Sequence, residues 1–113
     1  MSAYVPDRGD LVWLDFSPQA GHEQAGHRPG LVLSPAFYNG VAGLAIVCPI
    51  TSKAKGYPFE VPLPRTSPVR GVVLADQATC VDWHSRNIRR VGAATSDVLR
   101  EAQKNVGKLI GLR

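Results

Sequence analysis

The run Leu11-Val12-Trp13-Leu14-Asp15-Phe16 is the first of several short apolar segments that decide the fold class of this chain. These segments are rich in β-branched residues and are separated by glycine, proline and other turn residues, which is the pattern of β-strands. The other segments expected to form strands are 29–33, 44–50, 59–63, 71–75 and 79–83. Several short strands with frequent turns predict a compact antiparallel barrel or sandwich.

Two local signals add detail to this arrangement. Asn39-Gly40 predicts a tight turn between two strands. Pro62 and Pro64 place the segment 59–63 at an edge of the sheet or at a bulge, because proline cannot donate a ladder hydrogen bond.

The periodicity of the chain becomes helical after residue 95. One face of the predicted helix collects the apolar residues Val98, Leu99, Ala102, Val106, Leu109 and Ile110. Ser96 is the predicted N-cap, and Asp97 suits the positive end of the helix dipole. Gly107 weakens the helix, so it predicts a close packing contact. We expect the helix to lie on the β-structure, with a helix contact between two copies as the alternative.

Length and charge limit the function classes. The 113 residues predict a single domain over 1–113 that buries a core without disulfides or metal. A net charge of +4, with nine arginines to four lysines, favours an anionic partner. No signal peptide or membrane-length apolar run is seen, so we expect a cytoplasmic protein without membrane contact.

Cys48 and Cys80 lie inside apolar runs and are predicted to be buried, reduced thiols, with a disulfide as the alternative.

The candidate chemistry is concentrated in Gly21-His22-Glu23-Gln24-Ala25-Gly26-His27-Arg28-Pro29-Gly30. This segment places a carboxylate, two imidazoles and a guanidinium between two strands, as acid–base or phosphoryl chemistry requires. A polar hairpin without a special role is the alternative. A zinc site is not predicted, because His22 and His27 are five positions apart instead of four and the two cysteines are remote from each other.

Cleavage of RNA without a metal ion fits these residue types. The 2′-hydroxyl is the nucleophile, so the protein needs a base, an acid and groups that stabilise negative charge on phosphorus. Arg28 suits the phosphate, and Glu23 or a histidine suits the base. Thr51 follows a strand and is a candidate hydroxyl donor, although an ordinary strand-end threonine is the alternative. Lys53 and Lys55 add positive charge or are simply solvated. Four aromatic residues are candidates for base stacking or for core packing, namely Trp13, Phe16, Tyr57 and Trp83.

Ordered motifs along nearly the whole chain resemble the MazF/PemK family of toxin endoribonucleases. They are Gly9-Asp10-Leu11-Val12-Trp13-Leu14-Asp15-Phe16, the segment 21–29, Val32-Leu33-Ser34-Pro35, Pro49-Ile50-Thr51-Ser52, Lys55-Gly56-Tyr57-Pro58-Phe59-Glu60-Val61 and Leu74-Ala75-Asp76-Gln77. The similarity is strongest to the MazF branch.

The resemblance implies a mainly β protein with α-structure, namely a small SH3-like antiparallel β-barrel with a C-terminal helix. It implies a homodimeric toxin that cuts single-stranded RNA (mRNA) at short sequences. The expected products are a 2′,3′-cyclic phosphate and a 5′-hydroxyl, and no metal or other cofactor is expected. The expected protein partner is an antitoxin whose acidic, flexible tail blocks the site.

The family's catalytic arginine and threonine correspond to Arg28 and Thr51, and the glutamate of the MazF branch corresponds to Glu23. His22 and His27 are candidates for acid–base or substrate contact. The expected RNA-binding set is Phe16, Gln24, Ser52, Lys53, Lys55, Asp76 and Gln77.

One departure concerns the PemK branch, which carries an arginine two positions before its aspartate. Here Leu74 stands at the arginine position while Asp76 remains, so that acid–base pair is broken and Asp76 is expected to position bases instead. A related barrel serves as a toxin that binds DNA gyrase without catalysis, so the alternative function is a non-enzymatic barrel toxin that binds DNA gyrase or another partner. The C-terminal sequence Ile110-Gly111-Leu112-Arg113 argues against it, since it lacks the expected terminal tryptophan.

Overall fold

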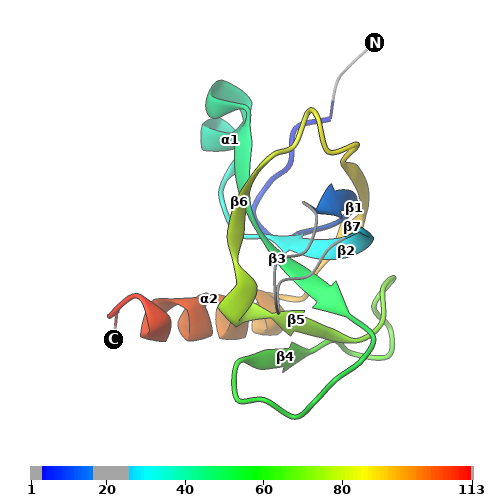
Figure 1. The fold of residues 1–113 in the computed structure, drawn as a ribbon, viewed down its shortest axis with the longest axis vertical. Coiled ribbons are helices and arrows are strands. Elements are labelled where there is room, and N and C mark those ends of the chain that lie inside the picture. Colours follow the sequence, from blue (N-terminus) through cyan, green and yellow to red (C-terminus); the bar gives the residue numbers. More distant parts are fainter. Residues whose placement is uncertain (1–3, 17–25, 113) are drawn as a thin grey trace.

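The computed structural model of the chain describes residues 4–16 and 26–112 (Figure 1). Its elements in chain order are β1 (Asp10–Phe16), β2 (Gly26–Val32), α1 (Ala36–Ala42), β3 (Leu44–Thr51), β4 (Glu60–Pro62), β5 (Val72–Leu74), the 3₁₀ turn η1 (Ala75–Gln77), β6 (Thr79–Asp82), β7 (Arg89–Ala93) and α2 (Ser96–Leu109). Each of the six expected strands is present with slightly different bounds. The seventh strand, β7, was not expected, because the strand pattern of its sequence is weak.

The strands form one antiparallel sheet in the order β4-β5-β3-β2-β1-β7, with β6 also paired to β3. The expectation of a mainly β fold with a C-terminal helix is therefore confirmed. Closure into a barrel is not seen in the described part of the chain, since β4 and β7 stand at the two ends of the strand order. β4 is an edge strand, as Pro62 predicted.

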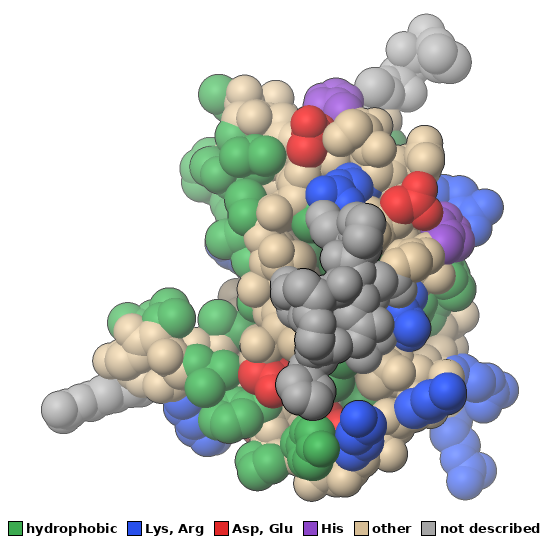
Figure 2. All heavy atoms as spheres, in the orientation of Figure 1, with side chains coloured by type: hydrophobic (Ala, Val, Ile, Leu, Met, Phe, Trp, Pro, Cys, Tyr) green, Lys and Arg blue, Asp and Glu red, His purple; other side chains and the backbone are tan. Residues whose placement is uncertain are grey.

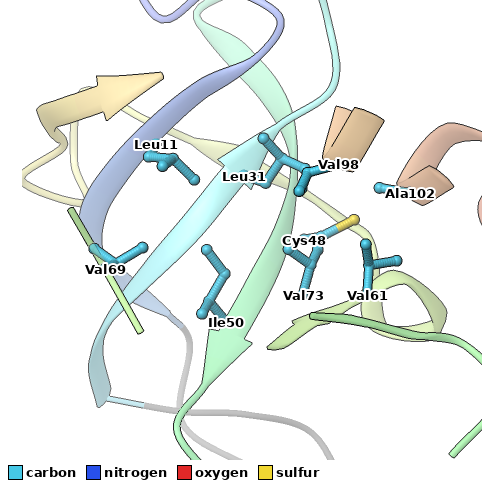
Figure 3. Packing of buried hydrophobic residues seen from close by; sticks show 9 residues of the cluster. All are labelled: Leu11, Leu31, Cys48, Ile50, Val61, Val69, Val73, Val98 and Ala102. Atoms are coloured by element: carbon cyan, nitrogen blue, oxygen red, sulfur yellow. The ribbon is translucent and has the colours of Figure 1, made fainter. Parts of the chain in front are cut away.

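Apolar side chains cover both faces of the central strands, so the sheet has two cores. The first contains Leu11, Leu31, Cys48, Ile50, Val61, Val69, Val73, Val98 and Ala102 (Figure 3). The second contains Val12, Leu14, Phe16, Val32, Ala45, Val47, Val81 and Trp83. Because side chains alternate along a strand, β1 supplies Leu11 to one core and Val12 to the other. The first core lies between the sheet and α2, as the helical periodicity predicted.

The ends of α2 differ from the sequence expectation. The N-cap is Thr95, one residue before the predicted Ser96, and its hydroxyl accepts a hydrogen bond from the backbone N–H of Val98 at 3.3 Å. At the other end, the N–H of Leu112 donates to the carbonyl of Gly107 at 2.7 Å. Gly111, at φ +88°, makes this Schellman-type stop. The close neighbour of Gly107 is therefore Leu112 and not the sheet.

Three smaller expectations were wrong. Asn39-Gly40 lies inside α1, and the left-handed residue of this region is Gly43 at φ +71°. The Asn39 amide is instead buried and donates to the carbonyls of Pro6 and Ser34. Cys80 is exposed, because alternation along β6 turns its neighbour Val81 inward. Leu109 and Ile110, expected on the buried face of α2, are exposed.

The helices in residues 4–16 and 26–112 are all too short or too polar to cross a membrane.

Candidate functional site

The pairing of β2 with β3 places Arg28 and Thr51 on the same face of the sheet. The paired residues are Val32 with Val47, Leu31 with Cys48, and Gly30 with Pro49. If this antiparallel register is continued beyond the last pair, Arg28 stands opposite Thr51. Arg28 and Gly30 share one face of β2, and Pro49 and Thr51 share the corresponding face of β3, because side chains alternate with a period of two.

Arg28 and Thr51 line one pocket, of about 520 Å³. We call it the Arg28–Thr51 pocket. Its other lining residues come from the segment after β3, from β4, from the end of β5 and from η1. They are Ser52, Lys53, Lys55, Tyr57, Glu60, Leu74, Asp76 and Gln77. All of the expected RNA-binding residues between positions 51 and 77 therefore meet in one place.

Thr51 is held firmly at the end of β3. Its side chain is almost fully buried, and its backbone is opposite Val72 of β5. The Thr51 hydroxyl oxygen accepts a hydrogen bond from the backbone N–H of Lys53 at 3.2 Å. A hydroxyl both donates and accepts hydrogen bonds, so the Thr51 hydroxyl can still donate its hydrogen to a group bound in the pocket.

Gly71 makes this position of Thr51 sterically allowed. It lies at φ +118°, and a Cβ built on it would come within 2.0 Å of the Thr51 carbonyl oxygen. Glycine is the residue without a Cβ, so the start of β5 can approach Thr51 closely.

Glu60, which was not among the expected site residues, organises the segment 52–59. Its carboxylate accepts hydrogen bonds from the backbone N–H groups of Lys55, at 3.0 and 3.2 Å, and of Gly56, at 3.0 Å. Within the same segment, the Lys55 Nζ lies 6.0 Å from the centroid of the Tyr57 ring. Glu60 belongs to the family-like motif 55–61, but its hydrogen bonds to the N–H groups of Lys55 and Gly56 form only because the segment 52–59 folds back toward β4.

Charges of both signs line the Arg28–Thr51 pocket. Arg28, Lys53 and Lys55 supply positive charge, and Glu60 and Asp76 supply carboxylates. The buried Leu74 also lines the pocket, at the position where the PemK branch has arginine.

Behind the pocket, burial raises the pKa of the Cys48 thiol to about 12, with a smaller contribution from Asp76. Cys48 therefore stays protonated and is no nucleophile at neutral pH.

A second hollow, of about 640 Å³, adjoins the first. We call it the Trp13–His27 hollow. Its lining residues are Trp13, Gly26, His27, Arg28, Pro29, Ile50, Ser52, Pro68, Val69 and Arg70. The rings of Trp13 and His27 are stacked, with centroids 5.3 Å apart and planes at 18°. Arg28 and Ser52 line both hollows, so they form the rim between them.

His27 is held in the second hollow by Asp15 on the neighbouring strand. The two residues are paired in register, and the His27 Nδ1 lies 2.8 Å from an Asp15 carboxylate oxygen. The other oxygen of Asp15 accepts a hydrogen bond from the Asn87 side chain at 2.8 Å. These hydrogen bonds, first from Asn87 and then from His27, hold the pKa of Asp15 below its ordinary value.

The structure does not bring every predicted site residue into the Arg28–Thr51 pocket. Phe16 is a correction: its ring packs in the second core and is only 7% exposed, so it has no open face on which to stack a base. Trp83 is likewise buried in that core. His27 lies on the opposite face of β2 from Arg28. His22, Glu23 and Gln24 fall outside the residues that the structure describes.

Positive side chains are spread over the face drawn in Figure 2, and several of them lie in one part of it. Figure 2 shows Lys and Arg side chains toward the lower right of the molecule, near the connections on either side of β4. In residues 4–16 and 26–112 there is no group of three or more histidine, cysteine or acidic side chains arranged to hold a metal ion. The cationic and hydroxyl groups that line the Arg28–Thr51 pocket are donors suited to an anion.

Comparisons with known proteins agree with this picture. Residues 7–110 match the family described as PemK-like, MazF-like toxin of type II toxin–antitoxin system. The endoribonuclease toxin MazF of Escherichia coli strain K12 is 45% identical over 111 residues, which cover 98% of this chain and 99% of that protein. A crystal structure of MazF from Deinococcus radiodurans matches with a TM-score of 0.94 and 59% identity, over 97% of this chain and 100% of that one. A MazE–MazF structure from the same organism matches with a TM-score of 0.88 and 58% identity, over 98% and 100% of the two chains.

Proposed function

Because the chain belongs to the family of PemK-like, MazF-like toxins of type II toxin–antitoxin systems, we propose that it is an endoribonuclease that cuts single-stranded RNA. The observation that supports this site most directly is that Arg28 and Thr51 line the same pocket. A guanidinium beside a fixed hydroxyl suits a phosphodiester, since both groups donate hydrogen bonds to phosphate oxygens.

The proposed reaction uses the substrate's own nucleophile. The ribose 2′-oxygen loses its proton to a base and forms a bond to phosphorus, and the bond from phosphorus to the 5′-oxygen breaks. The 5′-oxygen takes a proton and leaves as a hydroxyl, and the other fragment keeps a 2′,3′-cyclic phosphate. Arg28 stays positively charged and stabilises the extra charge on the non-bridging oxygens, together with the Thr51 hydroxyl. No step requires a metal ion.

The base and the acid are assigned by resemblance and by residue type. Glu23 is the proposed base, and His22 is a proposed substrate contact. His27 is a weaker candidate for proton transfer at the same phosphate, because it lies on the opposite face of β2 from Arg28. Its proposed role is therefore substrate contact.

The rest of the Arg28–Thr51 pocket would bind the bases and the backbone on either side of the cut. Lys53 and Lys55 would neutralise phosphates, and Asp76 and Gln77 would hydrogen-bond to base edges. The exposed Tyr57 offers a ring on which a base can stack. Gln24 belongs to the same proposed set.

The proposed partners are the cognate antitoxin and a second copy of the chain. An acidic antitoxin tail would compete with RNA for the cationic groups of the pocket. A homodimer would cover apolar side chains that the single chain leaves exposed, among them Phe37, Val41 and Ile110.

We further propose that residues 1–113 act as one cytoplasmic domain. We also propose that the sheet is of the SH3-like barrel type, since β3 pairs with β6 along its first part, with β2 in its middle and with β5 at its end.

The experiment is to incubate the protein with a long single-stranded RNA of mixed sequence in excess EDTA and to map the ends. We expect cuts at a short recurring sequence, with cyclic-phosphate and 5′-hydroxyl ends. RNA that stays intact would refute the proposed activity.

Two variants test the site itself. Arg28→Ala and Thr51→Ala are each expected to lower kcat by about 10²–10³-fold, the usual loss for one transition-state hydrogen-bond donor. Thr51→Ser should restore most of the rate. Thr66→Ala, which is exposed and outside the pocket, is the matched control. Full activity of the folded Arg28→Ala or Thr51→Ala variant would refute the site assignment.

A further inference from the structure

The Trp13–His27 hollow continues the Arg28–Thr51 pocket around the end of β2. Trp13, His27 and Pro29 belong to the face of the sheet that carries the first core, whereas Arg28 and Thr51 belong to the other face. The two hollows meet where Arg28 and Ser52 line both of them. An extended chain bound in one hollow therefore enters the other by crossing this rim.

The lining of the second hollow suits a nucleotide. Its volume of about 640 Å³ lies within the usual range of ligand sites. Arg28, Arg70 and His27 line it, and none of its lining residues within 4–16 and 26–112 carries a carboxylate. This differs from the first pocket, which Glu60 and Asp76 also line. In the described part of the chain, no acidic side chain is within ion-pair distance of Arg70.

The aromatic pair provides a ready surface for a base. Trp13 packs against the first core on one side and carries the stacked His27 ring. The Nδ1 of His27 is hydrogen-bonded to the Asp15 carboxylate, so Nε2 is the ring nitrogen that can hydrogen-bond to a ligand. The His27 side chain is 52% exposed although its orientation is fixed. Rings that are held in place and partly exposed bind unpaired bases with little loss of entropy.

We propose that the Trp13–His27 hollow is an RNA subsite that holds one nucleotide flanking the scissile phosphate. The base packs against the pair of rings formed by Trp13 and His27, and the backbone phosphate pairs with Arg70. This inference rests on the proposed function and extends it to a flank of the substrate. An acidic antitoxin segment is the other anionic candidate, but the stacked rings and the shared rim with the Arg28–Thr51 pocket favour RNA.

The test compares RNA substrates of different length once the cleavage sequence has been mapped. One oligonucleotide holds only the mapped sequence, and two others extend it by several nucleotides on the 5′ or on the 3′ side. For the unmodified protein, we expect one of the two extensions to raise kcat/KM. An abasic site at the first added position should remove most of that gain, because the base is no longer there to stack.

Arg70→Gln should reduce the gain from extension about tenfold, as expected for the loss of one charged hydrogen bond to phosphate. The matched control is Arg65→Gln, an exposed arginine of the same connection that does not line the hollow and should keep the full gain. The binding of an extended RNA with a 2′-deoxy sugar at the cut should weaken in parallel, as measured by fluorescence anisotropy.

Several results would overturn the proposal. One is an unmodified protein that cuts RNA but gains nothing from either extension, and another is an Arg70→Gln variant that keeps the gain. An equal loss on the short and the extended substrates would place Arg70 outside a flanking subsite. A loss confined to inhibition by the antitoxin would assign the hollow to the protein partner. If the unmodified protein cuts no RNA at all, the proposed function itself is refuted. The cleavage assay of the unmodified protein shows this before any variant is compared.

Discussion

Replacing Gly71 by alanine is expected to destabilise the chain and to disturb the candidate site together. An added Cβ would lie 2.0 Å from the Thr51 carbonyl oxygen, 2.7 Å from the Thr51 carbonyl carbon and 3.0 Å from the Cα of Ser52. All three atoms are backbone atoms, so no side-chain rotation relieves the overlap. The carbonyl oxygen would have to move by about 1.4 Å to reach the 3.4 Å at which ordinary contact begins.

Two contributions set the size of the effect. A φ of +118° is strained for any residue with a Cβ, which costs about 1–3 kcal/mol. Forcing apart the packed backbone costs a further amount of about 1–3 kcal/mol. The expected loss in the free energy of unfolding is therefore about 2–6 kcal/mol, a large share of the typical total of about 5–15 kcal/mol.

Gly56→Ala is the matched control, because Gly56 also has a positive φ, of +78°, but has no atom within 4 Å of the added Cβ. It should lose only the conformational contribution, about 1–2 kcal/mol. Urea unfolding of both variants measures the difference. If Gly71→Ala were no less stable than Gly56→Ala, the steric argument for the position of Thr51 would be wrong. RNA cleavage by Gly71→Ala, assayed where it is still folded, should also fall by more than tenfold.

Three further predictions follow from local contacts. Glu60→Gln should raise KM for RNA several-fold, since it weakens the charged hydrogen bonds that hold the segment 52–59, and steady-state cleavage checks this. A KM equal to that of the unmodified protein would contradict it. Thr95→Ala should lower the free energy of unfolding by about 1 kcal/mol through loss of the N-cap, whereas Ser96→Ala should have little effect. Equal urea midpoints for the two variants would contradict the N-cap role of Thr95. Because the folded protein lowers the pKa of Asp15, this carboxylate stabilises the fold above its ordinary pKa, and the stabilisation is lost as the pH falls through the lowered value. Asp15→Asn should therefore show a shallower loss of stability in acid, measured by unfolding across that pH range, and an unchanged slope would refute the contribution of Asp15.

Local pattern predicted most of the secondary structure. Short β-branched apolar runs bounded by turn residues located six strands, and the period of 3.6 located α2. The turn expected at Asn39-Gly40 failed for a tertiary reason. The Asn39 side chain is satisfied by Pro6, far away in the chain, and this contact supports a short helix where a turn was expected.

The strand β7 escaped prediction for a related reason. Its sequence, Arg89-Arg90-Val91-Gly92-Ala93, carries little apolar alternation. It becomes a strand by pairing with β1 at the edge of the sheet, across a bulge between Leu11 and Val12. Edge strands keep one side in solvent, so polar residues are tolerated there and the sequence signal is weak.

The sequence by itself determined the residue types of the site and the family that they resemble, since motifs such as those around Arg28 and Thr51 are contiguous in the chain. Only the tertiary structure decided which of these residues share a pocket. The β2–β3 register brings Arg28 toward Thr51, whereas strand alternation turns His27 to the opposite face and Phe16 into a core. A one-residue step along a strand reverses the direction of a side chain, so adjacency in sequence carries no information about sharing a site until the strands are paired.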